Sequence, residues 1–302
     1  MLSGTRVVIE QNEDLFPQAL RTIPRPPEKL YLIGNPAALQ EGLAIIGARK
    51  ATPYGIACAQ RFAKCAARKG IVIISGGALG CDAAAHRAAL EENGRTIAFL
   101  GGGCDKIYPV ANKSLFQRIV DKGGAVVSEY DWSHPPMKYG FRARNRLIAG
   151  LARATLIVEA GLPSGTFSTA DEALEANREV LVVPGSIASK TSHGANRLLY
   201  QGATPIVDDE SFEDVLFSLF GVLKQEEYAA SGVATGSLSS SQKKVYDALS
   251  AQSLRVDELK DVLQTESEIV KDHSIVMQIL IELEVSGLIA RYPDGRYGVA
   301  NF

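Results

Sequence analysis

The strongest constraint on this chain is a repeated alternation of short apolar runs with helical stretches, which continues from about residue 43 to about residue 220. Such alternation is typical of βαβ units, in which helices cover a mostly parallel sheet. Runs such as IVIIS and VLVVP are apolar throughout, as expected for strands buried on both faces. The sequence therefore predicts an α/β fold with a doubly wound, mostly parallel sheet. The predicted strands are residues 43–47, 71–75, 96–100, 125–128, 156–159, 180–183 and 205–207, and the predicted helices are residues 57–68, 83–92, 113–122, 168–177 and 195–201.

The pattern changes after residue 224. Residues 225–241 lose the apolar periodicity and gain Ser, Gly and Ala, which predicts a flexible linker. Residues 242–302 then contain three helical patterns and a hairpin, whose turn is expected at Pro293-Asp294-Gly295. Three helices and a hairpin predict a small C-terminal winged-helix domain, joined by the linker to a first domain of residues 1–224.

Composition excludes several classes of protein. The 302 residues are 46% hydrophobic and 22% charged, as in a chain that buries a sizeable core. No run of about 18 apolar residues could span a membrane, and Arg6 and Glu10 interrupt any signal peptide, so we expect a cytoplasmic protein. The four cysteines and four histidines have no ligand spacing, so no metal and no cofactor are expected.

Charge is distributed unevenly along the chain. The formal net charge of −2 gives no general sign of nucleic-acid binding. Residues 134–158 nevertheless contain five lysines or arginines and no acidic residue, and residues 180–207 contain Lys190 and Arg197 and no acidic residue. The two windows predict a local positive patch, although chance clustering on a solvated surface explains them as well.

The loops that follow the predicted strands are rich in glycine. In a doubly wound sheet, ligands bind outside the carboxyl ends of the strands, where helix N-termini attract anions. The sequence has no GxGxxG for a dinucleotide, no GxxxxGK[ST] for a nucleoside triphosphate and no GxSxG for an esterase. The usual enzyme signatures are therefore absent, and we expect no catalytic activity.

The segment GFRARNRLIAG, residues 140–150, combines an aromatic residue with three arginines on alternate positions. Arginines bind phosphates, and an aromatic ring offers a stacking surface to an unpaired base. The segment is interpreted as a loop that binds single-stranded DNA. The alternative is that Phe141 fills the core and the arginines pair with carboxylates.

Several motifs in one order make the whole chain resemble the DNA-processing protein A (DprA/Smf) family of bacteria. They are GARKATPYG, SGGALGCDAAAHRAAL, GGGCDKIYP, SEY, FRARNRLIAG, VEAGLPSGTFSTADEA and VPGSIASKTSHGANRLLYQGA. The resemblance implies an extended Rossmann-like domain that binds single-stranded DNA, and a C-terminal winged helix. It also implies a homodimer that protects incoming strands and loads the recombinase RecA during natural transformation.

The resemblance also implies which residues bind DNA. They are Arg49, Ser75, Gly76, Gly77, Lys138, Phe141, Arg142, Arg144, Asn145, Arg146, Ser164, Gly165, Asn196 and Arg197. This chain departs from the family in having Arg142 where proline usually follows the motif's phenylalanine, and Cys81 where isoleucine is common. Many relatives carry an N-terminal helical module, whereas this sequence begins almost directly at the Rossmann-like part.

Two other functions are weighed against this one. Pro163-Ser164-Gly165-Thr166 resembles the phosphate loop of nucleoside monophosphate phosphoribohydrolases, but the position of their glutamate falls on Thr169. A winged helix alone would suggest a transcription factor, yet its candidate recognition segment, residues 268–286, has four acidic residues against Lys271. Such a helix would be repelled by DNA phosphates, so a protein contact is more plausible.

Overall fold

A computed structural model describes residues 1–162, 165–221, 238–251, 254–264, 273–286, 288–291 and 295–299. The chain divides into two compact units, Met1–Lys224 and Gln225–Phe302. Most of the predicted linker, residues 225–241, lies outside the described residues, and the first helix of the second unit already begins at Ser240. None of the described helices is long and apolar enough to cross a membrane.

The first unit is built on a sheet of nine strands. The strands are β1 (Arg6–Glu10), β2 (Lys29–Gly34), β3 (Gly42–Ile46), β4 (Ile73–Ser75), β5 (Thr96–Phe99), β6 (Ala125–Ser128), β7 (Ala152–Ile157), β8 (Glu179–Val182) and β9 (Thr204–Pro205). They lie in the order β1-β2-β6-β5-β4-β3-β7-β8-β9. All neighbours from β6 to β9 are parallel, whereas β1 and β2 are antiparallel additions at one edge. The predicted doubly wound, mostly parallel sheet is confirmed, and β1 and β2 were not predicted.

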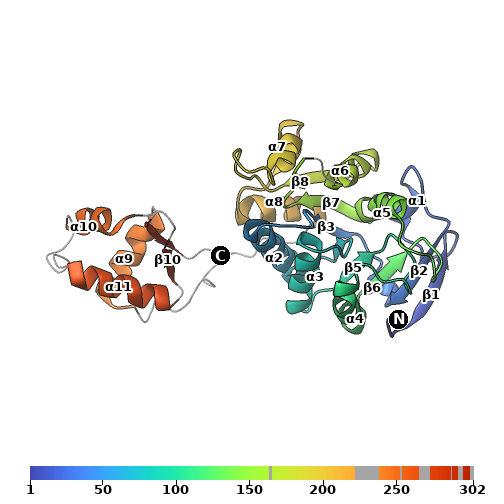
Figure 1. Ribbon diagram of the computed structural model, residues 1–302, viewed down its shortest axis with the longest axis horizontal. Helices are drawn as coiled ribbons and strands as arrows, with labels where there is room; N and C mark the ends of the chain where they lie inside the picture. The colour runs from blue at the N-terminus through green and yellow to red at the C-terminus, as the bar shows by residue number, and fades with distance from the viewer. Residues whose placement is uncertain are drawn as a thin grey trace. The chain divides into compact units, whose positions relative to one another are not determined.

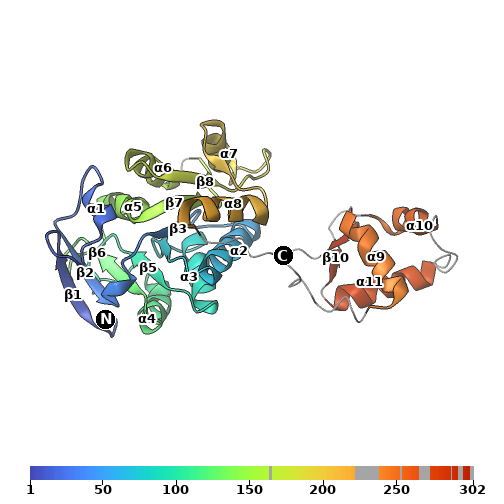
Figure 2. The same cartoon turned by 180° about the vertical axis from the view of Figure 1, so that it is seen from behind.

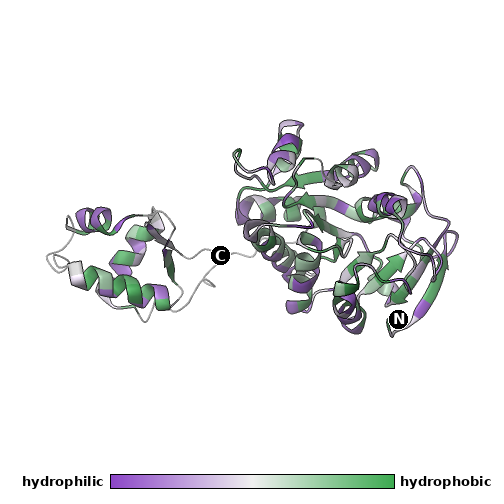
Figure 3. Cartoon of the chain, in the orientation of Figure 1, coloured by the Kyte–Doolittle hydropathy of each residue, from purple (hydrophilic) through white to green (hydrophobic). Residues whose placement is uncertain are grey.

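Helices cover both faces of this sheet (Figures 1 and 2). The longer ones are α2 (Pro53–Arg68), α3 (Cys81–Glu91), α4 (Lys113–Asp121), α5 (Lys138–Leu151), α6 (Thr166–Glu175), α7 (His193–Tyr200) and α8 (Asp209–Phe220); the short ones are α1 (Gln18–Arg21), η1 (Pro36–Ala38) and η2 (Val110–Asn112). Apolar side chains of α2, α3 and α8 pack on one face, and those of α1, α5, α6 and α7 pack on the other. Figure 3 shows the apolar colour concentrated on the central strands, as burial on two faces requires.

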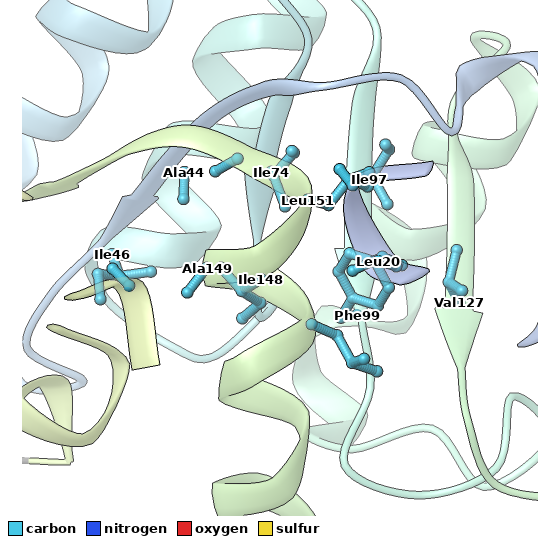
Figure 4. Close-up of a cluster of buried hydrophobic side chains, with 14 of the residues drawn as sticks. Leu20, Ala44, Ile46, Ile74, Ile97, Phe99, Val127, Ile148, Ala149 and Leu151 are labelled. Carbon is cyan, nitrogen blue, oxygen red and sulfur yellow. The ribbon is translucent and has the colours of Figure 1, made fainter. Parts of the chain in front are cut away.

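The main difference between the structure and the sequence interpretation concerns helix α5. The segment FRARNR, interpreted above as a loop, is the middle of this helix, which carries the chain from β6 across the sheet to β7. Its buried residues include Arg144, Leu147, Ile148 and Leu151, which have the spacing of one helix face. Figure 4 shows Ile148, Ala149 and Leu151 facing Ile74, Ile97 and Phe99 of the sheet. The spacing of the apolar residues in this segment does indicate a helix, but Arg144 occupies one of the positions on its buried face.

The second unit contains α9 (Ser240–Ala251), α10 (Val256–Gln264) and α11 (His273–Val285), followed by an antiparallel hairpin of β10 (Ile289–Arg291) and β11 (Tyr297–Val299). The elements have the predicted order, and Leu254 bridges to Tyr297 beside the hairpin. Pro293 and Asp294, from the expected turn, lie outside the described residues. The winged-helix assignment itself stays a prediction.

Histidine His86 is buried beneath the sheet without a charge. Its Nδ1 lies 2.6 Å from Oγ1 of Thr96, and that hydroxyl donates to the carbonyl of Ile73 at 2.7 Å. Because the Thr96 hydroxyl donates its only proton to Ile73, its Oγ1 accepts the other hydrogen bond, from Nδ1–H of His86. The neutral ring of His86 is therefore the Nδ1–H tautomer. Burial, with a smaller effect of the positive charges of Arg144 and Arg87, lowers the pKa of His86 from 6.5 to about 3.

This pKa predicts a loss of stability in mild acid. Below pH 6.5 the unfolded chain protonates His86 while the folded chain does not, so the free energy of unfolding should fall by up to about 1.4 kcal/mol per pH unit down to about pH 3. Urea denaturation of the wild type and of His86→Gln between pH 7 and pH 5 measures this effect. The variant should show a shallower pH dependence, and equal slopes would contradict the prediction.

Candidate nucleic-acid interface

A pocket of about 700 Å³ opens at the carboxyl ends of the central strands. The chain runs outward from β3 through β4, β5 and β6, and then returns to place β7 on the other side of β3, so this point is the topological switch of the sheet. Loops after β3, β4, β5, β7 and β8 line the pocket together with α5. Seven predicted residues lie in its wall: Arg49, Lys138, Phe141, Arg142, Arg144, Asn145 and Gly165.

The wall of this pocket is strongly basic. Three cationic residues that line it, Arg49, Lys138 and Arg142, were predicted and are exposed, whereas Lys50 and Lys190 were not predicted as site residues. None of these five forms an ion pair with a carboxylate in the part of the chain that the structure describes. Lys50 follows Arg49 in its motif and Lys190 lies in the second acid-free window, so charge patterning could have found both. Unpaired cations around a concave surface favour a polyanionic ligand.

Two aromatic rings form part of the same wall. Phe141 is half-buried, and its ring centroid lies 5.4 Å from that of Tyr108, at an interplanar angle of 53°. The guanidinium carbon of Arg49 lies 5.6 Å from the centre of the Phe141 ring. Tyr108 is 47% exposed, and it was not predicted as a site residue although it lies in the motif GGGCDKIYP. Phe141 therefore does not fill the core, and the rings are open to a planar ligand group.

Arg144 lies at the floor of the pocket and is only 5% exposed. Its Nη1 donates to the carbonyl of Phe99 at 2.8 Å, and the guanidinium lies so close to Gly76 that a Cβ there would be 1.8 Å from Nη1. Burial lowers the pKa of Arg144 to about 10, while the negative charge of Asp82 opposes this shift. Glycine is required at position 76 because the side chain of Arg144 occupies the space of its Cβ.

Asp82 is the one carboxylate among the described lining residues, and it is already engaged. Its Oδ2 accepts hydrogen bonds from the backbone N–H groups of Gly76, at 3.2 Å, and Ala78, at 3.3 Å. Burial raises the pKa of Asp82, and the charge of Arg144 opposes the shift. These two amides belong to a glycine-rich loop at the edge where an anionic ligand was expected, but they hold a carboxylate of the chain itself.

The other predicted residues lie outside the wall of the pocket. The Ser75 hydroxyl is buried and donates to the carbonyl of Ile45 at 2.6 Å, and Gly77 packs against the ring of Phe116. Asn196 exchanges two hydrogen bonds with the backbone of Gly185, and Arg197 is exposed on α7. Ser164 lies outside the described residues.

Two arginines of the first acid-free window pair with distant carboxylates. Arg146 Nη2 lies 2.6 Å from Glu129, and Arg153 Nε lies 3.0 Å from Glu41. Arg153 is at the amino end of β7, opposite the edge that carries the pocket. The predicted positive patch is therefore smaller than the window suggests, because α5 carries the chain to the far edge of the sheet before β7 begins.

The position expected for a phosphoribohydrolase glutamate is Thr169, which is buried and lines the pocket. Of the nearest acids, Glu172 pairs with Arg25 at 2.8 Å, and Asp171 is exposed outside the pocket wall. The geometry therefore offers no carboxylate, among the described residues at this position, to replace the missing glutamate.

Removal of the Arg144 guanidinium should destabilise the fold. In Arg144→Ala the buried Asp82 loses its compensating charge, so the free energy of unfolding should fall by about 3–5 kcal/mol. The matched control is Arg142→Ala, an exposed position on the same helix, which should change stability by less than about 0.5 kcal/mol. Urea denaturation measures both.

A second substitution separates charge from packing in that experiment. Adding Asp82→Asn to Arg144→Ala removes the uncompensated carboxylate and should recover part of the lost stability. If the double variant is less stable than Arg144→Ala, the charge of Asp82 is not the reason for the loss.

Comparisons with known proteins show the family of this chain. The family model of DNA recombination-mediator protein A matches residues 7–218. Protein Smf of Escherichia coli is 38% identical over 214 residues, which are 70% of this chain; the chain spans 57% of the length of that relative.

Two solved structures are similar to the first unit. One is DNA processing protein A from Streptococcus pneumoniae, with a TM-score of 0.65 and 35% identity, over 70% of this chain and 74% of that one. The other is DNA processing protein A from Helicobacter pylori, whose structure addresses its single-stranded DNA binding mode, with a TM-score of 0.64 and 34% identity, over 71% of this chain and 97% of that one. The family model covers more than half of the sequence, and we conclude that the chain belongs to the DNA recombination-mediator protein A family.

Proposed function

We propose that this chain is a DNA-processing protein that binds single-stranded DNA in the pocket at the carboxyl edge of its sheet. The observation that carries the proposal is the set of five unpaired cations around the half-exposed rings of Phe141 and Tyr108. Lysine and arginine neutralise phosphates, and an exposed ring stacks on a base that has no partner strand. The single-stranded DNA binding of the Helicobacter pylori relative supports this assignment.

Eight of the predicted residues divide into two groups under this proposal. Arg49, Lys138 and Arg142 bind phosphates, and Phe141 stacks on a base. Arg144, Ser75, Gly76 and Gly77 keep the loops in position from below, since each is buried. We propose that the protein performs no chemistry on the strand, which is supported by the engagement of Asp82, the one carboxylate in the described wall, with backbone amides.

The pocket assignment predicts different effects for a charge and for a ring. Arg49→Ala should weaken binding of single-stranded oligothymidylate and reduce the slope of log K against log salt by about 0.7, because one phosphate contact is lost. Phe141→Ala should weaken binding by about 1–3 kcal/mol and leave the slope unchanged. Fluorescence anisotropy at several salt concentrations measures both.

The matched control for these variants is Arg153→Ala, which removes an arginine from the opposite edge of the sheet and should leave the affinity unchanged.

Duplex DNA of equal length should bind more weakly than the single strand to the wild type, because its bases are not available for stacking. Equal affinity for both forms, or a loss confined to Arg153→Ala, would overturn the proposal.

We further propose that the chain acts in the cytoplasm as a homodimer that protects incoming strands and loads RecA during natural transformation, as its family resemblance implies. Addition of the protein should accelerate RecA assembly on strands already covered by a single-strand-binding protein, and no acceleration would contradict the loading role. The mass of the purified chain by light scattering tests the homodimer.

The second unit is proposed to contact protein and not DNA. Helix α11 contains no lysine or arginine, while Glu282 and Glu284 lie near its end. A helix that enters the major groove needs cations near the phosphates. The transcription-factor alternative is therefore disfavoured by the charge of this helix.

A further inference from the structure

A cluster of three aromatic side chains lies before and within the first turn of α5, outside the pocket wall. The rings of Tyr130 and His134 are nearly parallel, with centroids 4.5 Å apart and an interplanar angle of 13°. Tyr139 meets both rings edge-on, at 6.4 Å and 6.3 Å. Its hydroxyl lies 3.1 Å from Nε2 of His134, which fixes the arrangement. Neither the pocket nor the fold described above accounts for this cluster.

The cluster is accessible to solvent. Tyr139 is 56% exposed, and Tyr130 and His134 are each partly exposed. Tyr130 packs against α5, because a Cβ at Gly140 would lie 3.3 Å from its Cε2. Tyr139, by contrast, leaves more than half of its surface in water. The exposed ring is therefore available to a ligand.

The charges beside the cluster suit a phosphate backbone. Lys138 and Arg142 are exposed, lie four positions apart on α5 and form no ion pair with a described carboxylate. Of the acidic residues nearest to the cluster, Glu129 is neutralised by Arg146, at 2.6 Å. Asp131 is the other, and its Oδ1 accepts hydrogen bonds from the backbone N–H and the hydroxyl of Ser133. The two unpaired cations outnumber this one exposed carboxylate.

The cluster is continuous with the pocket through the first turn of α5. Lys138 lines the pocket and directly precedes Tyr139 in the sequence. Gly101 lies against the ring of Phe141, and the next residue toward the cluster, Gly140, lies close both to the carbonyl of Gly101 and to the ring of Tyr130. A single strand held by Phe141 and Lys138 thus has a second aromatic surface, that of Tyr139, on the same helical turn.

We propose that Tyr139, supported by the Tyr130–His134 stack, is a second base-stacking site, which takes the base of a nucleotide that lies beyond the pocket on the same strand. This inference rests on the proposed function. Stacking on a ring is tolerant of sequence, so the site adds affinity for longer strands without selecting a base.

The test measures affinity against strand length. Oligothymidylates from the dinucleotide upward are titrated into the full-length wild type, and affinity should rise as strands become long enough to reach the cluster. Tyr139→Ala should leave the dinucleotide affinity unchanged and weaken binding of long strands by roughly fivefold or more. Tyr139→Phe keeps the ring and should retain the wild-type affinity.

The matched control is Tyr200→Ala. Tyr200 is 93% exposed and ends α7, so it is a still more accessible tyrosine at the opposite edge of the sheet from the pocket. This control should bind strands of every length as the wild type does, and thermal melting should confirm that all variants are folded.

Several outcomes would overturn the inference and leave the proposed function standing. They are an unchanged long-strand affinity in Tyr139→Ala, an equal loss for the dinucleotide and the long strands, and an equal loss in Tyr139→Phe, which would assign the effect to the hydroxyl. Absence of single-strand binding by the wild type would overturn both proposals.

Discussion

A buried positive charge holds the functional edge of this protein together. The guanidinium of Arg144 reaches from α5 to the carbonyl of Phe99 at the end of β5, and it lies against Gly76 at the end of β4. Asp82 offsets its charge and binds the backbone amides of Gly76 and Ala78. Because a buried charge is costly unless it is compensated, these groups fix one another, and the loops above them have a rigid floor.

This floor explains how a chain with an excess of acidic residues can present a basic pocket. Most arginines that form ion pairs in the described part of the chain, such as Arg61 and Arg68, balance carboxylates on the outer surface. At the carboxyl edge the one carboxylate of the described wall faces inward, so Arg49, Lys50, Lys138, Arg142 and Lys190 are left without partners. The field that a strand of DNA would meet is set by this local imbalance and not by the net charge.

Helix α5 divides the roles of residues that are neighbours in the sequence. On a helix, positions two apart point in different directions, so successive arginines of FRARNR have different surroundings. Arg142 faces the pocket, Arg144 is buried beneath it, and Arg146 pairs with Glu129. The same helix carries Phe141 in the wall of the pocket and Tyr139 outside it, which gives one turn two aromatic surfaces.

The sequence by itself determined the parallel part of the sheet and the edge that carries the pocket. Apolar runs such as IVIIS identified the central strands because burial on both faces leaves no polar alternation, and the glycine-rich loops marked the edge at which the pocket opens. The family motifs led to Arg49, Lys138 and Phe141, all of which lie in the pocket wall. Only the tertiary structure showed that Ser75, Gly77, Arg146 and Asn196 are turned toward the fold, and that Tyr108 and Lys190 join the pocket. The physical reason is that a motif records which residues follow a strand, whereas the direction of each side chain depends on the helix, turn or distant carboxylate that it meets after the sheet has closed.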